Sequence, residues 1–255
     1  MRRLIFLLFV VTSSQSCEYY MRSGCYTMQM GLGAYANSQF FTPSTLTSFG
    51  GYVSPHFAWW NARWHAGFEG NFGIARVKGD SAKSLLFFEE SKHTNSGLLD
   101  IALFGGVNLG SLQSPLFLDI LLFSHFNIYD QSSHSIENGF YYAGIQLSQI
   151  LSINDFWNLE WGLGYGYMLI GFYDINVSAN LPYPYAIPSR VKSEANHLLK
   201  AYITLTMARS YYVRLNAMYL TPTDSQSFVL YNDNVSFSHN GNMMLGLEFG
   251  FNLTF

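Results

Sequence analysis

Apolar residues recur at every second position of this chain from residue 25 onward, which is the period of a β-strand and not of a helix. In the stretch CYTMQMGLGAYA, residues 25–36, apolar side chains alternate with threonine, glutamine and glycine. In FWNLEWGLGYGYMLIG, residues 156–171, seven apolar positions in succession alternate mainly with asparagine, glutamate and glycine. The pattern predicts an all-β chain with almost no helix.

Ten strands are predicted from this alternation, and they are long. They span residues 25–36, 49–60, 63–74, 97–109, 115–127, 138–149, 156–171, 196–208, 211–220 and 241–255. Strands of soluble sheets usually have about five or six residues, whereas a strand that crosses a membrane needs about 9 to 11. The lengths therefore favour transmembrane strands.

The connections between these strands alternate between short and long. Short ones lie near residues 61–62, 110–114, 150–155 and 209–210, and long ones near 37–48, 75–96, 128–137, 172–195 and 221–240. This alternation is typical of a closed up-and-down antiparallel transmembrane β-barrel whose long loops are extracellular. We expect about ten strands, within a range of 8 to 12, and an even count places both termini on the periplasmic side.

Tryptophan provides an independent test of this topology, because its ring favours the headgroup level of a membrane. The five tryptophans are Trp59, Trp60, Trp64, Trp157 and Trp161, and all of them lie beside a predicted short turn. Tyr211 and Tyr212 follow another short turn. We therefore predict one aromatic girdle at the periplasmic rim.

The first sixteen residues have the layout of a secretory signal peptide. Two arginines precede an apolar run from Leu4 to Val11, which is too short to cross a bilayer, and small residues follow. The prediction is a signal peptide over residues 1–16 and a barrel over 17–255, the alternative being an ordinary N-terminal strand. In an exported chain, Cys17 and Cys25 are candidates for a small disulfide loop, and Cys17 is alternatively a lipidated first residue.

The final strand, GNMMLGLEFGFNLTF, alternates strictly and ends the chain on Phe255. It resembles the C-terminal signature of Gram-negative outer-membrane β-barrel proteins, and the nearest general comparison is with the small opacity-type and OmpA-like barrels. The resemblance implies that Phe255 is part of the signal read by the barrel-assembly machinery. Those small barrels usually have eight strands, so a count of ten departs from them.

Composition excludes two other classes of protein. The chain has 255 residues, of which 11% are charged, against roughly 25% in an ordinary soluble domain. A net charge of −3 leaves no basic face for nucleic acid. A mean hydropathy of +0.10, with no apolar run of about 20 residues outside the N-terminus, argues against membrane helices.

Charged residues of the predicted strands fall on the inward-facing positions. They are Arg63, Glu69, Asp100, Asp119, Glu160, Lys200, Arg214 and Glu248, accompanied by His65 and His125. We predict two ion pairs between neighbouring strands, Glu160 with Lys200 and Arg214 with Glu248. Because a barrel of this size has a lumen largely filled by side chains, the network is either structural or lines a narrow conducting path.

No constellation for catalysis is evident. Ser124 and His125 are adjacent on a strand and therefore point to opposite faces, and the Ser/His groups at 132–135 and 236–239 lie in predicted loops. Glu89 and Glu90 are the only neighbouring acids at the predicted outer rim. The sequence predicts no catalytic, cofactor or metal site.

Two predicted outer loops are unusually apolar. SLLFFEE contains Phe87 and Phe88, and LPYPYAIP contains Tyr183 and Tyr185. Exposed apolar groups often mark binding sites, so these residues are candidate contacts for a surface ligand, unless they fold back over the barrel mouth and bury one another.

The sequence thus predicts an integral outer-membrane barrel without enzymatic activity, with an adhesin-like or structural role. Its expected partners are outer-membrane lipid and lipopolysaccharide, the assembly machinery and a surface ligand. The alternatives are a small porin or hydrophobic-solute channel, an outer-membrane barrel hydrolase and, if the fold assignment fails, a soluble secreted β-sandwich.

Overall fold

The computed structural model of the chain is built from strands. It describes residues 24–41, 45–79, 94–111, 114–131, 134–154, 156–177, 190–208, 210–226, 228–230, 233–235 and 238–254. Within these ranges no helix is long and apolar enough to cross a membrane. The predicted signal peptide, Cys17, the four aromatic loop candidates and Phe255 lie outside them, so the disulfide and the assembly signal stay predictions.

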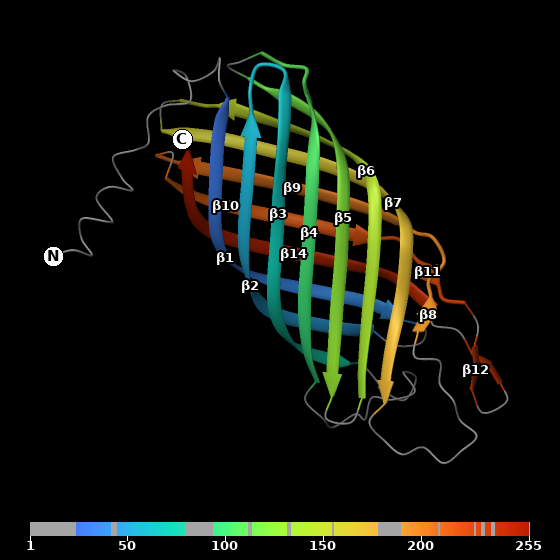
Figure 1. Cartoon of the computed structure of the whole chain (residues 1–255). Coiled ribbons are helices and arrows are strands. Elements are labelled where there is room, and N and C mark those ends of the chain that lie inside the picture. Colours follow the sequence, from blue (N-terminus) through green and yellow to red (C-terminus); the bar gives the residue numbers. More distant parts are fainter. Residues whose placement is uncertain are drawn as a thin grey trace.

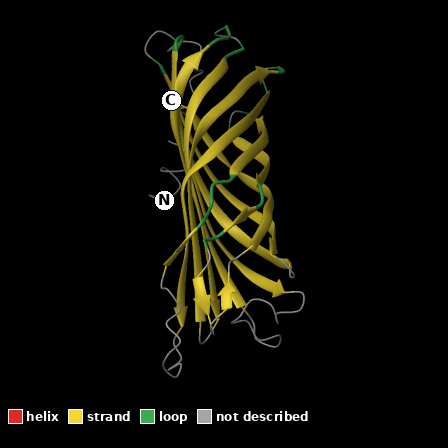
Figure 2. Ribbon diagram, turned by 90° about the vertical axis from the view of Figure 1, so that its right-hand side faces the viewer, coloured by secondary structure: helices red, strands yellow, loops and turns green. Residues whose placement is uncertain are grey.

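Ten long antiparallel strands form a closed wall (Figures 1 and 2). They are β1 (Cys25–Phe41), β2 (Thr45–Trp60), β3 (Trp64–Gly79), β4 (Thr94–Asn108), β5 (Leu116–Gln131), β6 (His134–Ser152), β7 (Trp157–Val177), β9 (His197–Met207), β10 (Tyr211–Leu220) and β14 (Ser238–Thr254). Each pairs with the next of these strands along the chain, and β14 pairs with β1. The predicted closed barrel of ten strands is confirmed.

The two ends of the barrel differ. The turn end carries the short connections, the start of β1 and the end of β14. At the opposite end, here called the loop end, β9 and β10 stop earlier than their neighbours. Two short strands continue the wall there: β8 (Arg190–Lys192) pairs with β7, and β11 (Thr223–Asp224) pairs with β14. A separate hairpin of β12 (Phe228–Leu230) and β13 (Asp233–Val235) follows.

Two of the predicted long loops are largely strand. Residues 37–48 and 128–137 were expected to be loops, but β1 continues to Phe41, β2 begins at Thr45, β5 continues to Gln131 and β6 begins at His134. Backbone pairing continues beyond the apolar belt, where the outward side chains include Ser38 and Asp130 and the alternation of apolar and polar residues is lost. A pattern based on apolar periodicity therefore ends before the strand does.

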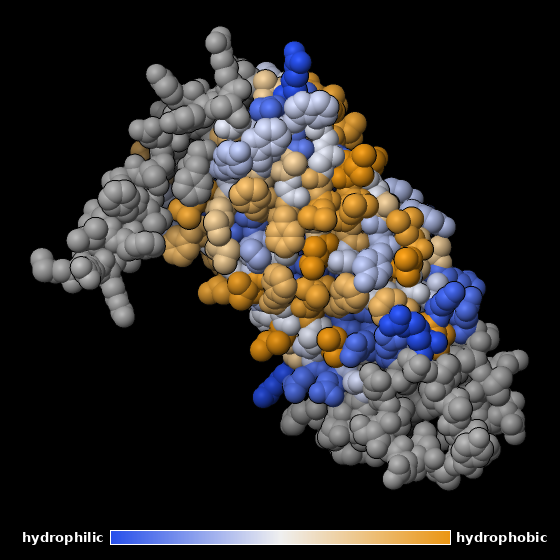
Figure 3. Space-filling view, viewed as in Figure 1, coloured by the Kyte–Doolittle hydropathy of each residue, from blue (hydrophilic) through white to orange (hydrophobic). Residues whose placement is uncertain are grey.

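The outer surface of the wall is apolar. Ile74, Leu32 and Ile120 are 78%, 69% and 67% exposed. A continuous apolar surface of this kind would be anomalous in water. Figure 3 shows hydrophobic residues across the middle of the wall. On β3 the outward residues from Trp64 to Ile74 are apolar or small, a span that matches the roughly 9 to 11 residues of a membrane-crossing strand.

Four of the five tryptophans have positions consistent with an outer girdle, and one does not. All five belong to the turn end of β2, β3 or β7. The ring of Trp60, however, lies 6.4 Å from the ring of Phe117, whose side chain is buried inside the barrel. Trp60 follows Trp59 directly, and adjacent residues of a strand face opposite sides, so both cannot face lipid.

The loop half of the lumen contains a cluster of closely packed hydrophobic side chains. Its inward side chains form one cluster of buried hydrophobic residues that includes Tyr52, Phe140, Tyr142, Leu198, Leu220 and Met244. Phe140, Leu198 and Leu220 are completely buried. Alternation along each strand thus supplies a lipid-facing surface on one side and a filled interior on the other.

We expect Phe140→Ala to destabilise the barrel by about 3 to 5 kcal/mol, because it leaves a cavity in a closely packed interior. Ile145→Ala on the same strand is the matched control: Ile145 faces outward and is 57% exposed, so lipid replaces the lost contacts. Reversible urea unfolding in detergent measures both. Equal losses of stability in the two variants would contradict a packed lumen.

Candidate functional site

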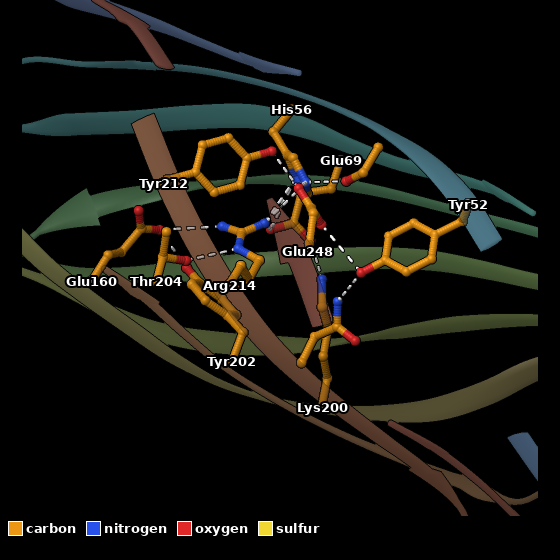
Figure 4. Close-up of polar contacts among 12 residues, drawn as sticks. Tyr52, His56, Glu69, Glu160, Lys200, Tyr202, Thr204, Tyr212, Arg214 and Glu248 are labelled. Carbon is orange, nitrogen blue, oxygen red and sulfur yellow. Dashed lines mark hydrogen bonds and ion pairs between the residues drawn. The ribbon is translucent and has the colours of Figure 1, made fainter. Parts of the chain in front are cut away.

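The strongest concentration of chemistry in the described chain is a cluster of charged and polar side chains across the middle of the lumen, here called the central cluster (Figure 4). Its members are Tyr52 and His56 of β2, Glu69 of β3, Glu160 of β7, Lys200, Tyr202 and Thr204 of β9, Tyr212, Arg214 and Asn216 of β10, and Glu248 of β14. All occupy inward positions of the alternating strands. Closure of the wall brings six strands of distant sequence to this one level.

Arg214 lies at the centre of the cluster. Its Nε donates to Thr204 Oγ1 at 2.7 Å, and its Nη1 lies 3.0 Å from His56 Nδ1. Its Nη1 and Nη2 approach the carboxylates of Glu69 and Glu160 at 3.6 and 3.8 Å. Since Arg214 is 4% exposed, these contacts replace the water that its charge would otherwise bind.

Lys200 pairs with Glu69, which lies across the lumen on β3. The predicted pair of Lys200 with Glu160 is wrong. In the observed register Lys200 is opposite Gly164 and Glu160 is opposite Thr204, so the two charges are four residues apart along neighbouring strands. Glu160 instead accepts a hydrogen bond of 2.8 Å from the Tyr202 hydroxyl.

The predicted direct pair of Arg214 with Glu248 is replaced by a bridged arrangement. The two residues are register partners on β10 and β14. His56 contacts both of them, since its Nε2 is 3.3 Å from Glu248 Oε1. The hydroxyls of Tyr212 and Tyr52 also donate to the Glu248 carboxylate, the latter at 3.3 Å.

Two glycines of β1 make room for this carboxylate and its partners. A Cβ atom at Gly31 would collide with the Glu248 and Tyr212 side chains, and one at Gly33 would collide with the Tyr52 ring. The Gly-Leu-Gly pattern of residues 31–33 therefore serves packing, and no helix follows it to form a phosphate-binding loop.

Two further histidine–carboxylate pairs flank the central cluster. Toward the turn end, His65 Nδ1 lies 2.8 Å from Asp119 Oδ2, and its ring stacks on Phe117. Toward the loop end, His125 Nδ1 lies 2.6 Å from Asp100 Oδ1. All four titratable side chains are buried.

Arg63, predicted to be inside the barrel, lies outside it. It is exposed in the turn between β2 and β3, where its backbone N–H donates to Asn61 Oδ1 at 2.8 Å. The strand pattern extended one residue too far, because β3 begins at Trp64.

The sequence search also missed a serine–histidine pair. Ser54 Oγ contacts His56, and the two residues are separated by two positions on β2, a spacing that puts both on one face. A search for serine two residues from histidine on a predicted strand would have found them. Ser54 is completely buried, however, and the adjacent cavity, lined by His56, Glu69 and Asn216 among others, measures about 20 Å³, room for about one water molecule. This geometry gives no substrate access to the serine.

The described side chains also offer no metal site, since no group of three or more His, Cys, Asp or Glu residues among them could hold an ion. The ion pairs of the cluster neutralise its buried charges.

Comparisons with known proteins identify the fold but not a family. No protein-family model and no curated protein sequence matches this chain. The outer-membrane protease OmpT from Escherichia coli matches its structure with a TM-score of 0.56 at 11% identity, over 91% of this chain and 96% of that chain. The chain has the fold of an outer-membrane β-barrel.

Other barrels of different function also match. The transport unit of the autotransporter AIDA-I from Escherichia coli gives a TM-score of 0.45 at 10% identity, over 94% of this chain and 92% of that one. The toluene transporter TbuX from Ralstonia pickettii gives 0.42 at 7% identity, over 91% and 89%. Since the OmpT match, at 11% identity, establishes fold alone, function has to be inferred from the residues of this barrel.

Lys200→Met is expected to destabilise the barrel by about 3 to 5 kcal/mol, because it leaves the buried Glu69 carboxylate without its closest cation. The double variant Lys200→Met, Glu69→Gln should regain part of this loss, because it removes the unpaired charge. Lys192→Met, at an exposed position of β8, is the control with no expected change. The midpoint of urea unfolding reports all three. A Lys200→Met midpoint equal to that of the control would overturn the assignment of the pair.

Proposed function

We propose that this chain is a sealed, non-enzymatic barrel of the Gram-negative outer membrane that presents its loop end for interaction with surface ligands. The observation that carries the proposal is the filled lumen. The central cluster closes the middle and the hydrophobic cluster fills the loop half, leaving in the middle the cavity of about 20 Å³. A hydrated ion or a small solute needs a continuous path through the barrel, and a cavity with room for about one water molecule does not provide one.

The outer belt and the fold support this location. In outer-membrane barrels short turns face the periplasm and long loops face outward. Applied here, this rule places the turn end, with its tryptophans, in the periplasm and the loop end outside the cell. Export by the signal peptide over residues 1–16, assembly through the strand that ends at Phe255, and contact with lipopolysaccharide are parts of the same proposal.

The loop end is a collar of strands that extends beyond the apolar belt. On β3, Arg76 and Lys78 follow Ile74 on the outward face, so the strand continues past the apolar belt into water. β7 extends to Val177 and pairs along its edge with β8, where Arg190 forms a bidentate hydrogen-bonded ion pair with Asp174, both bonds at 2.6 Å. A collar of paired strands of this kind suits the display of binding loops.

A channel for hydrophobic solutes is the second candidate, because the loop half of the lumen is lined by apolar and aromatic side chains such as Phe140 and Met244. It requires this cluster to rearrange and open a path. A hydrolase is less well supported, since Ser54 has no access to substrate.

The mature chain, residues 17–255, refolded in detergent and inserted into a planar bilayer, is expected to show no discrete current steps. The filled lumen is the reason, and heat-modifiable migration on a gel confirms that the inserted protein is folded. Reproducible steps would contradict the sealed barrel and favour the channel. Uptake of a radiolabelled monoaromatic hydrocarbon into liposomes distinguishes a hydrophobic-solute channel from a sealed barrel and from an ion-conducting channel.

Replacement of the aromatic loop residues tests the surface role. The variant with Phe87, Phe88, Tyr183 and Tyr185 all changed to alanine is expected to reduce adhesion of expressing bacteria to cultured host cells by about 30-fold, since an aromatic hot spot contributes about 2 kcal/mol or more. Lys192→Ala, an exposed change on the collar, is the control. Undiminished adhesion with normal surface expression would rule out these loops as the contact.

A further inference from the structure

The outer wall carries a groove whose position and shape are set by strand register. It lies at the turn end of β7, β9, β10 and β14 and has a volume of about 460 Å³. Pockets that hold small molecules have volumes of about 300 to 1,000 Å³. The groove is therefore large enough for a defined ligand.

Two rows of outward side chains enclose it. At the rim, Trp157, Met207, Tyr211 and Phe251 follow one another in register across the four strands. In the next row toward the middle of the membrane, Val213 lies between Leu205 and Phe249. Valine is the smallest side chain of the seven, so the hollow is centred on Val213.

The groove belongs to the lipid-facing belt. Met207, Val213 and Phe249 are 43%, 38% and 57% exposed, and each continues the apolar surface of its own strand. Tyr211 and Trp157, at the rim, have the amphipathic rings that favour the headgroup level of a membrane. An occupant with an apolar tail in the hollow and a polar head at the rim matches the chemistry of both rows of side chains.

We propose that this groove binds one acyl chain of a phospholipid from the periplasmic leaflet, with the headgroup beside Trp157 and Tyr211. Lipid is the solvent of the belt with which the groove is continuous, and the walls of the groove are almost entirely apolar. The site differs from the general lipid contact of the barrel, because its shape holds one chain in one place. The proposal rests on the membrane orientation inferred under the proposed function, but not on the sealed lumen or on the role of the loops.

Native mass spectrometry of the barrel, refolded in detergent with phosphatidylethanolamine carrying 16-carbon chains, tests the site. The wild type is expected to retain one phospholipid. Val213→Trp fills the groove and should lower the retained fraction by about 10-fold or more, a change of about 1.4 kcal/mol in binding. Leu215→Trp is the matched control, because Leu215 faces lipid two residues further along β10 and does not line the groove.

Leu205→Trp is a second filling variant in case Val213→Trp does not fold, as judged by heat-modifiable migration. Equal lipid retention in the wild type, the filling variant and the control would overturn the proposal, as would a wild type that retains no lipid. A dimer that disappears on filling the groove, with no retained lipid in the wild type, would instead identify the groove as a contact between two copies of the chain.

Discussion

The requirement that no backbone N–H or C=O be left unpaired in lipid governs this structure. Each unpaired group in hydrocarbon costs several kcal/mol, so a transmembrane sheet has to close on itself. Here the closing pair is β1 with β14, continuous from Thr27 opposite Thr254 to Gln39 opposite Asn242. The first and last strands of the chain thus complete one another. Once this ladder and the nine other pairings of the wall are formed, they determine which side chains point into the lumen and at what level.

Closure fills the lumen with side chains of two kinds, and the charged kind has a cost. Buried ion pairs often contribute little net stability, because desolvation offsets their attraction. Their arrangement suggests a role in register. Lys200 on β9 pairs with Glu69 on β3, and Arg214 on β10 approaches Glu160 on β7. A slip of two residues keeps the inward and outward faces unchanged but moves a side chain by about 6.6 Å along the strand, which separates such pairs. Apolar packing alone discriminates less between such registers.

The existence and order of the strands could be predicted from the sequence, because alternation reports directly which side chains meet lipid. The ends of the strands were harder to predict. In β1, Asn37 and Gln39 are buried inside the barrel, but the outward residues beyond the apolar belt are no longer apolar, so the alternation stops before the strand does. The partners inside the lumen could not be predicted. Opposite charge and neighbouring strands predicted Glu160 as the partner of Lys200, whereas the partner is Glu69. The approach of Lys200 to Glu69 across the lumen depends on the register of every strand between them and on the curvature of the wall.

The packing of the interior draws attention to the two outer surfaces of the barrel, the belt and the loop end. In the central cluster and the hydrophobic cluster the inner side chains neutralise and pack one another, which favours the surfaces that meet lipid or the exterior as sites of specificity. Both places show departures from a uniform wall. At the loop end, β8 and β11 continue the wall beyond the ends of β9 and β10. An isolated β-bridge between Ser193 and Ser225 joins them. At the turn end, the same two strands carry the hollow at Val213. The shortest transmembrane strands, β9 and β10, thus take part in both departures from a regular barrel, at the loop end and at the turn end.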